Sequence, residues 1–179
     1  MDDGLAAACY AGAVIRLALL FLFGDPRMAF ALRVLAAITR LCPCAPADEL
    51  CDRLHRQSAA AIAIVALEQP DTERAAALLV GAGVHESCFR VERQILGWLP
   101  DGSPIYGPAV TSYQLEVRPA ERPALLADPV AAARLALRAA RAGWRSYACG
   151  SPGCGGDAGA RAAAELAASY QAAWWALAQ

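Results

Sequence analysis

The apolar residues of this chain recur mostly with the spacing of α-helices, and short breaks rich in Pro, Gly and Asp separate the periodic stretches. Four stretches of this kind predict helices, at residues 49–68, 72–87, 128–144 and 160–177. Asp71 or Thr72 is expected to cap the second of them, and Pro129 suits the first turn of the third. The pattern therefore predicts a mainly α fold.

The periodicity changes between residues 95 and 106. ILGWL and PIY flank the segment PDGS there, in which Pro sets φ and Gly accepts a positive φ. Two short extended segments around such a turn predict a small β-hairpin.

Residues 5–23 are apolar throughout except for Arg16, and nineteen positions are just enough to span a bilayer. A membrane anchor, a buried helix and a membrane-surface helix all fit this stretch. A cleavable signal fits poorly, because the chain begins with MDD rather than with basic residues. The next apolar run, residues 28–41, contains Arg33 and Arg40 and suits an amphipathic or core helix better than a spanning one.

The Pro-rich segment CPCAPAD, residues 42–48, is the best candidate for a domain boundary. We therefore expect a hydrophobic N-terminal segment, residues 1–45, followed by a domain that spans residues 46–179.

The charge of the chain excludes one broad class of partner. The formal net charge is −1, and all sixteen basic residues are Arg. A nucleic-acid-binding surface normally requires a clear excess of positive charge, so no nucleic-acid partner is expected. The sequence contains no phosphate-binding or dinucleotide-binding loop, and no cofactor is expected.

Seven cysteines are many for 179 residues, and the odd number leaves at least one without an intrachain partner. Disulfides, free buried thiols and a metal site are the alternatives, in that order of preference. No CxxC pair is present and His55 and His85 are the only histidines, so no metal site is expected. The pairing of the cysteines stays open.

One helical face combines apolar residues with a carboxyl group. Ala75, Leu79, Ala82 and Glu86 follow one another at intervals of four, three and four residues, which places them on one face. Partial desolvation there favours the neutral form of Glu86 and raises its pKa. A carboxylic acid that stays protonated near neutral pH suits glycosidic bond cleavage. The alternative is that Glu86 lies in water at a frayed helix end.

The segments around this carboxyl group resemble the lysozyme superfamily, in particular soluble lytic transglycosylases and phage lysozyme-like proteins. Glu86-Ser87 matches the end of the catalytic helix of that family, and GPAVTSYQLEV, residues 107–117, matches its GPAxGxxQxE loop at Gly, Pro, Ala, Gln and Glu. Weaker matches to the family's AYNAG segment are Tyr147 and Gly150. The resemblance covers residues 50–175 and implies a lysozyme-like (α+β) fold with the hairpin after the catalytic helix. One departure is Thr111, which replaces Gly and would be strained at a positive φ.

The resemblance also implies roles for individual residues. Glu86 would be the general acid and then the base, and Gln114 would hydrogen-bond the substrate. Tyr147 would face Glu86 across a cleft, and Ser87 would contact the substrate beside it. Three aromatic residues would either stack on sugar faces or pack in the core, namely Trp98, Tyr106 and Tyr113.

A second carboxylate distinguishes hydrolysis from transglycosylation in this family. Hydrolytic lysozymes pair the acid with another Asp or Glu, and Glu116 and Asp101 are the candidates here. Lytic transglycosylases need one acid only, because a hydroxyl group of the substrate closes an anhydro ring. Since Glu116 suits a structural role better, a single-acid mechanism is preferred.

These observations predict a peptidoglycan-cleaving glycosidase that acts on the MurNAc–GlcNAc bond outside the cytoplasm or in a phage particle, with peptidoglycan strands as its partner. Residues 5–23 would tether it to a membrane, although the positive-inside rule places the part after them in the cytoplasm. The alternatives are an inactive relative that binds glycan or serves in assembly, and a membrane-anchored helical protein in which the match is accidental.

Overall fold

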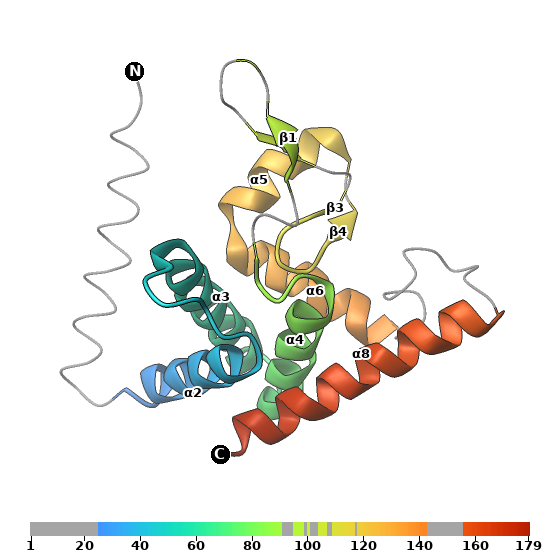
Figure 1. The fold of residues 1–179 in the computed structure, drawn as a ribbon. Coiled ribbons are helices and arrows are strands. Elements are labelled where there is room, and N and C mark those ends of the chain that lie inside the picture. The colour runs from blue at the N-terminus through green and yellow to red at the C-terminus, as the bar shows by residue number, and fades with distance from the viewer. Residues whose placement is uncertain are drawn as a thin grey trace.

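The computed structural model describes residues 25–90, 95–98, 100, 104–106, 109–116, 118–142 and 156–179. These residues contain six α-helices and one short 3₁₀ helix, η2 (Pro119–Glu121). The α-helices, labelled in Figure 1, are α2 (Pro26–Leu41), α3 (Glu49–Leu67), α4 (Thr72–Glu86), α5 (Arg122–Ala127), α6 (Pro129–Ala142) and α8 (Gly156–Leu177).

The helices begin where the sequence provides a cap. The Asp48 carboxylate accepts a hydrogen bond from the Cys51 backbone N–H at 3.0 Å, in the first turn of α3. Asp128 accepts from the N–H groups of Val130 at 3.0 Å and Ala131 at 2.9 Å at the start of α6. The predicted helices at 49–68 and 72–87 are confirmed, and the helix predicted at 128–144 is confirmed for its described part, α6. Asp71 stands at the N-cap position of α4, but its side chain makes no capping hydrogen bond, so the expected cap is wrong. The last helix begins at Gly156, four residues before its predicted start.

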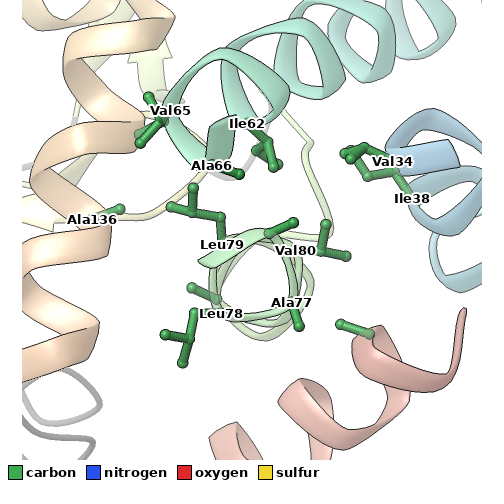
Figure 2. Close-up of a cluster of buried hydrophobic side chains, with 14 of the residues drawn as sticks. Val34, Ile38, Ile62, Val65, Ala66, Ala77, Leu78, Leu79, Val80 and Ala136 are labelled. Carbon is green, nitrogen blue, oxygen red and sulfur yellow. The ribbon is translucent and has the colours of Figure 1, made fainter. Parts of the chain in front are cut away.

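Helix α4 is the centre of the core. All its residues from Ala75 to Gly83 are buried, as expected for a helix that is apolar all round and surrounded by others. Figure 2 shows α4 among side chains from α2, α3 and α6. The residues labelled there that have no exposed surface include Val34, Ile38, Ile62, Val65, Ala66, Leu79, Val80 and Ala136.

Helix α8 packs closely on α4 because of a glycine. A Cβ atom at Gly81 would lie 2.8 Å from the Tyr170 Cα atom of α8, closer than real Cβ contacts. The two helices form the most extensive helix pair of the described chain. Gly81 therefore sets their separation.

Helix α2 contributes Val34 and Ile38 to the same core and packs against α3, α4 and α8. The core helix expected for the second apolar run is thus confirmed, and part of the segment 1–45 shares one core with helices of the segment 46–179. Among the described residues no helix is long and apolar enough to cross a bilayer. Residues 5–23 lie outside the described residues.

The expected α+β class, with a small hairpin as its β part, is wrong as a description of this fold, although the mainly α part is right. In the described chain, β1 (Ile95–Trp98) pairs antiparallel with β2 (Pro104–Tyr106), and β3 (Ala109–Val110) pairs with β4 (Leu115–Glu116). Strands of two to four residues in separate pairs do not form a sheet layer. Helices packed around α4 form most of the core, and Phe89, Tyr113 and Leu115 add to it from outside the helices.

Candidate functional site

Glu86 is the last residue of α4 and follows the buried residues on one face of that helix. Ala75, Leu79 and Ala82 on the same face are completely buried, and the Glu86 side chain keeps 20% of its surface exposed. This burial raises the pKa of the carboxyl group from 4.5 to about 7. The partly desolvated acid expected from the sequence is therefore present, and the frayed helix end is not.

His85 lies close to the Glu86 carboxyl group, which the helical spacing did not predict. Its Nε2 atom lies 4.0 Å from Glu86 Oε1, and its side chain is 17% exposed. The two residues differ by about 100° around the helix axis, yet their side chains meet because the helix ends there.

The chain is held tightly just after the acid. The Ser87 N–H donates to the Gly83 carbonyl at 3.2 Å and ends the helix. Cys88 and Phe89 then take φ values of 53° and 58°, and the Phe89 ring returns onto Gly83, which has no side chain in its way. A disulfide joins Cys88 to Cys42, the residue that ends α2. The contact of Phe89 with Gly83 and the disulfide to the end of α2 therefore both hold the segment that follows Glu86 in place.

A hydrogen bond joins the helix end to the turn between β3 and β4. The Ser87 hydroxyl, completely buried, donates to the Ser112 carbonyl at 2.8 Å. The turn itself is closed by a hydrogen bond from the Gln114 N–H to the Thr111 carbonyl at 3.1 Å. The two segments that carry the family resemblance, residues 86–87 and the turn containing Gln114, are thus in direct contact.

This turn contains a strained residue, as the sequence predicts for a positive φ at this position. Thr111 has φ 71°, in the left-handed region that β-branched residues rarely occupy. Its hydroxyl accepts a 3.3 Å hydrogen bond from the Tyr113 N–H, which helps to hold the turn. Strain of this kind costs about 1–3 kcal/mol and is often found at binding or catalytic loops.

Of the two expected ligand-contacting residues in the turn, one is enclosed and one is not. Tyr113 is only 5% exposed, and its ring packs edge-on against Phe89 at 6.5 Å. Burial raises the pKa of its hydroxyl group. This environment favours core packing over sugar stacking for Tyr113. Gln114 is half-buried, and its amide donates a long 3.4 Å hydrogen bond to the Thr111 carbonyl.

The structure does not describe the side chains of the remaining predicted site residues. Asp101 and Tyr147 lie outside the described residues, as do the side chains of Trp98, Tyr106 and Glu116. A small pocket of about 100 Å³ lies beside the turn, between Thr111 and Ser112 on one side and Gln57 and Ser58 of α3 on the other. Glu86 is not among the residues that line it.

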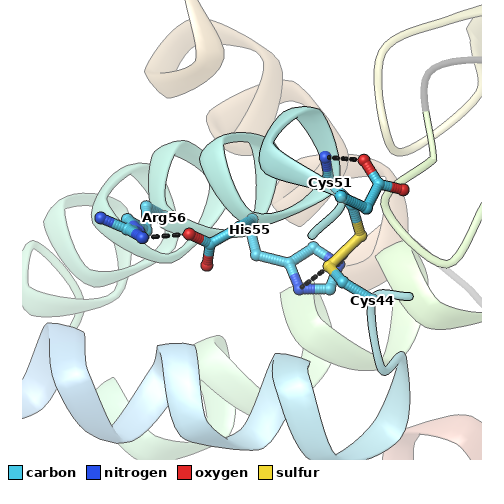
Figure 3. A network of polar contacts seen from close by, with 6 residues as sticks. Cys44, Cys51, His55 and Arg56 are labelled. Carbon is cyan, nitrogen blue, oxygen red and sulfur yellow. Dashed lines mark hydrogen bonds and ion pairs between the residues drawn. A yellow bond between two sulfur atoms is a disulfide. The ribbon is translucent and has the colours of Figure 1, made fainter. Parts of the chain in front are cut away.

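The structure also settles two cysteine pairs and shows a cluster that the sequence analysis missed. Cys42 pairs with Cys88, and Cys44 pairs with Cys51, while Cys9, Cys149 and Cys154 lie outside the described residues. The second disulfide lies against the buried ring of His55 (Figure 3).

The signal for this cluster was present in the sequence. Cys51 and His55 are four residues apart in a helix and therefore share a face. Burial lowers the pKa of His55, against the nearby carboxylates of Asp52 and Asp48. Two cysteines and an imidazole form a group that can hold a metal ion.

Comparison of the chain with protein-family models, with curated proteins and with solved structures finds no match.

Proposed function

We propose that this protein is a glycosidase that cleaves the MurNAc–GlcNAc bond of peptidoglycan, with Glu86 as its single acid and base. The observation that carries the proposal is the 2.8 Å hydrogen bond from the Ser87 hydroxyl to the Ser112 carbonyl. It supports the proposal because it holds the Glu-Ser helix end against the turn that leads to Gln114. Those are the two sequence segments that resemble the catalytic segments of the lysozyme superfamily.

The protonation of Glu86 supports the chemistry. With a pKa of about 7, a large fraction of the carboxyl group carries a proton at neutral pH. It donates this proton to the glycosidic oxygen while the C1–O bond breaks and positive charge develops on the sugar. The resulting carboxylate then removes a proton from the attacking hydroxyl group, which restores the acid.

The attacking group decides the reaction class. In a transglycosylase, a hydroxyl group of the same sugar attacks C1 and forms an anhydro ring, and no second carboxylate is needed. In a hydrolase, water attacks, and Glu116 or Asp101 would serve as the second carboxylate. We prefer the single-acid reaction.

The disulfides support a location outside the cytoplasm. Disulfides persist in oxidising compartments, and two of them fix α2, α3 and the end of α4 in this chain. We propose the cell envelope, secretion or a phage particle as the setting, with residues 5–23 as a membrane tether.

A second candidate is a glycan-binding or assembly protein without catalytic activity. Thr111 favours it, because this residue replaces the Gly of the catalytic loop that the chain resembles and takes a positive φ there. In that case the Glu86 helix end would only position the turn.

The test is cleavage of purified peptidoglycan by the full chain, with products resolved by mass. We expect anhydro-muropeptides from the wild type and none from Glu86→Gln. The matched control is Glu165→Gln, which neutralises an exposed carboxylate on α8 and should leave cleavage unchanged. Reducing-end products would indicate hydrolysis, and a folded wild type that cleaves no wall type would favour the glycan-binding candidate.

A further inference from the structure

The cluster of Cys44, Cys51 and His55 is separate from the Glu86 site and has no part in the proposed cleavage. Cys44 lies in the turn before α3, Cys51 lies in the first turn of that helix, and His55 lies one turn further along. The Asp48 cap fixes the start of the helix through the Cys51 N–H. Local structure alone therefore brings the three side chains together.

The environment of His55 is unusual for a buried polar ring. The residue is only 1% exposed. Its ring packs edge-on against Phe89 at 6.1 Å between the ring centroids, and its nitrogen atoms contact sulfur. Nδ1 lies 3.5 Å from Cys44 Sγ, and Nε2 lies 3.6 Å from Cys51 Sγ and 3.8 Å from Cys44 Sγ. Disulfide sulfur atoms are weak acceptors, so the ring obtains little from them in the oxidised state. A buried imidazole directed at two sulfur atoms is better suited to a metal ion.

These separations agree with the dimensions of a zinc site. In a tetrahedral site with Zn–S of about 2.3 Å and Zn–N of about 2.1 Å, a sulfur and a nitrogen ligand lie about 3.6 Å apart. The two distances from His55 Nε2, 3.6 and 3.8 Å, already match this value. Only the two sulfur atoms must separate, from their bonded distance to about 3.8 Å, which opening of the disulfide permits.

We propose that Cys44, Cys51 and His55 bind a zinc ion once the Cys44–Cys51 disulfide is reduced. A dithiol supplies two electrons and two protons, so that it becomes a disulfide and the cysteines become two thiols. Zn²⁺ then displaces the two thiol protons and binds both sulfur atoms and His55 Nε2. Water takes the fourth position, since both cysteines are partly exposed.

The two disulfides of the described chain differ in how many of their cysteines are exposed. Cys44 and Cys51 are both partly exposed, whereas in the other disulfide Cys88 is partly exposed and Cys42 is only 3% exposed. A reductant in solution therefore reaches the Cys44–Cys51 pair more easily. The start of α3 is cross-linked in both states, by a disulfide when oxidised and by zinc when reduced.

The first experiment uses the full-length, untagged chain. It is reduced anaerobically with a phosphine, freed of reductant and treated with iodoacetamide, with and without one equivalent of Zn²⁺. Peptide mass mapping should show that Zn²⁺ protects Cys44 and Cys51 from alkylation. Equal alkylation of both residues in the two samples would overturn the proposal, and this readout depends on no substitution.

The second experiment identifies the ligands with Co²⁺, which reports thiolate and tetrahedral coordination by its absorption. We expect one Co²⁺ per reduced chain, with a thiolate-to-cobalt charge-transfer band, and none for the oxidised chain. These measurements use a background variant of the chain in which three cysteines outside the described residues are replaced by Ser, namely Cys9, Cys149 and Cys154.

Within this background, Cys44→Ser and Cys51→Ser should each lose the band, and His55→Asn should bind Co²⁺ more weakly than the unsubstituted background. Circular dichroism confirms that each variant is folded. The matched control replaces Cys42 and Cys88 together with Ser, which removes two other thiols, and it should keep the band. A band that depends on Cys42 and Cys88 would contradict the proposed ligand set.

Discussion

Replacement of Glu86 by Gln should stabilise the protein at neutral and alkaline pH. The substitution keeps the size and shape of the side chain and removes the charge that the partly buried position disfavours. Burial at the end of α4 raises the pKa of this carboxyl group from 4.5 to about 7. Since each pKa unit corresponds to about 1.4 kcal/mol, ionised Glu86 destabilises the folded state by about 3 kcal/mol.

The sign of the pH dependence follows from the raised pKa. The folded state binds the Glu86 proton more tightly than the unfolded state, so this contribution to stability is fully present below pH 4.5. It falls as pH rises and is lost above about pH 7. A neutral Gln does not titrate. The variant should therefore match the wild type near pH 4 and exceed it by about 3 kcal/mol at pH 8.

Urea unfolding of both proteins between pH 4 and 8 measures this difference, with the disulfides kept intact. The difference between wild type and variant cancels the titration of all other groups. Glu165→Gln, on the exposed face of α8, serves as the control and should change stability by less than about 0.5 kcal/mol at any pH. A constant difference between Glu86→Gln and wild type across this range would refute the desolvation argument.

Two further single substitutions and one double substitution test the packing around the site, each by urea unfolding. Gly81→Ala should destabilise by about 1–3 kcal/mol, because its methyl group meets the backbone of α8; an unchanged midpoint would contradict the close helix contact. Ser87→Ala should cost about 1 kcal/mol, because it removes the hydrogen bond to Ser112, and it should reduce peptidoglycan cleavage; full activity would separate the turn from catalysis. Removal of the disulfide by the Cys42→Ala and Cys88→Ala pair should cost about 4 kcal/mol, from the chain entropy of a 46-residue loop; a loss below about 1 kcal/mol would contradict this account.

The helices could be predicted from the sequence because their signals are local. Apolar spacing, the Pro breaks and, for α3 and α6, the Asp caps act within one or two turns, and they place α3, α4 and α6 correctly. The same spacing placed Glu86 at the end of a buried stripe. The strain at Thr111 was also predictable, since it depends only on a β-branched side chain at a position where the family has Gly.

Features that depend on which helix ends meet could not be predicted. The pairing of Cys42 with Cys88 requires α2 and α4 to pack together, and no local pattern contains that information. Tyr113 illustrates the same limit, because its burial depends on the return of Phe89 over the end of α4. The α+β expectation failed because turn signals predicted strand pairs without showing that helices form most of the core.

The most direct test of Glu86 as the acid compares its titration with the pH dependence of peptidoglycan cleavage. A ¹³C-carboxyl NMR titration of the full chain gives the pKa of Glu86, and the cleavage rate is measured over the same pH range. We predict a Glu86 pKa of about 7 and a cleavage rate that falls as pH rises through the same value. A cleavage rate that does not follow the titration of Glu86, or cleavage that persists in Glu86→Gln, would contradict the proposed mechanism.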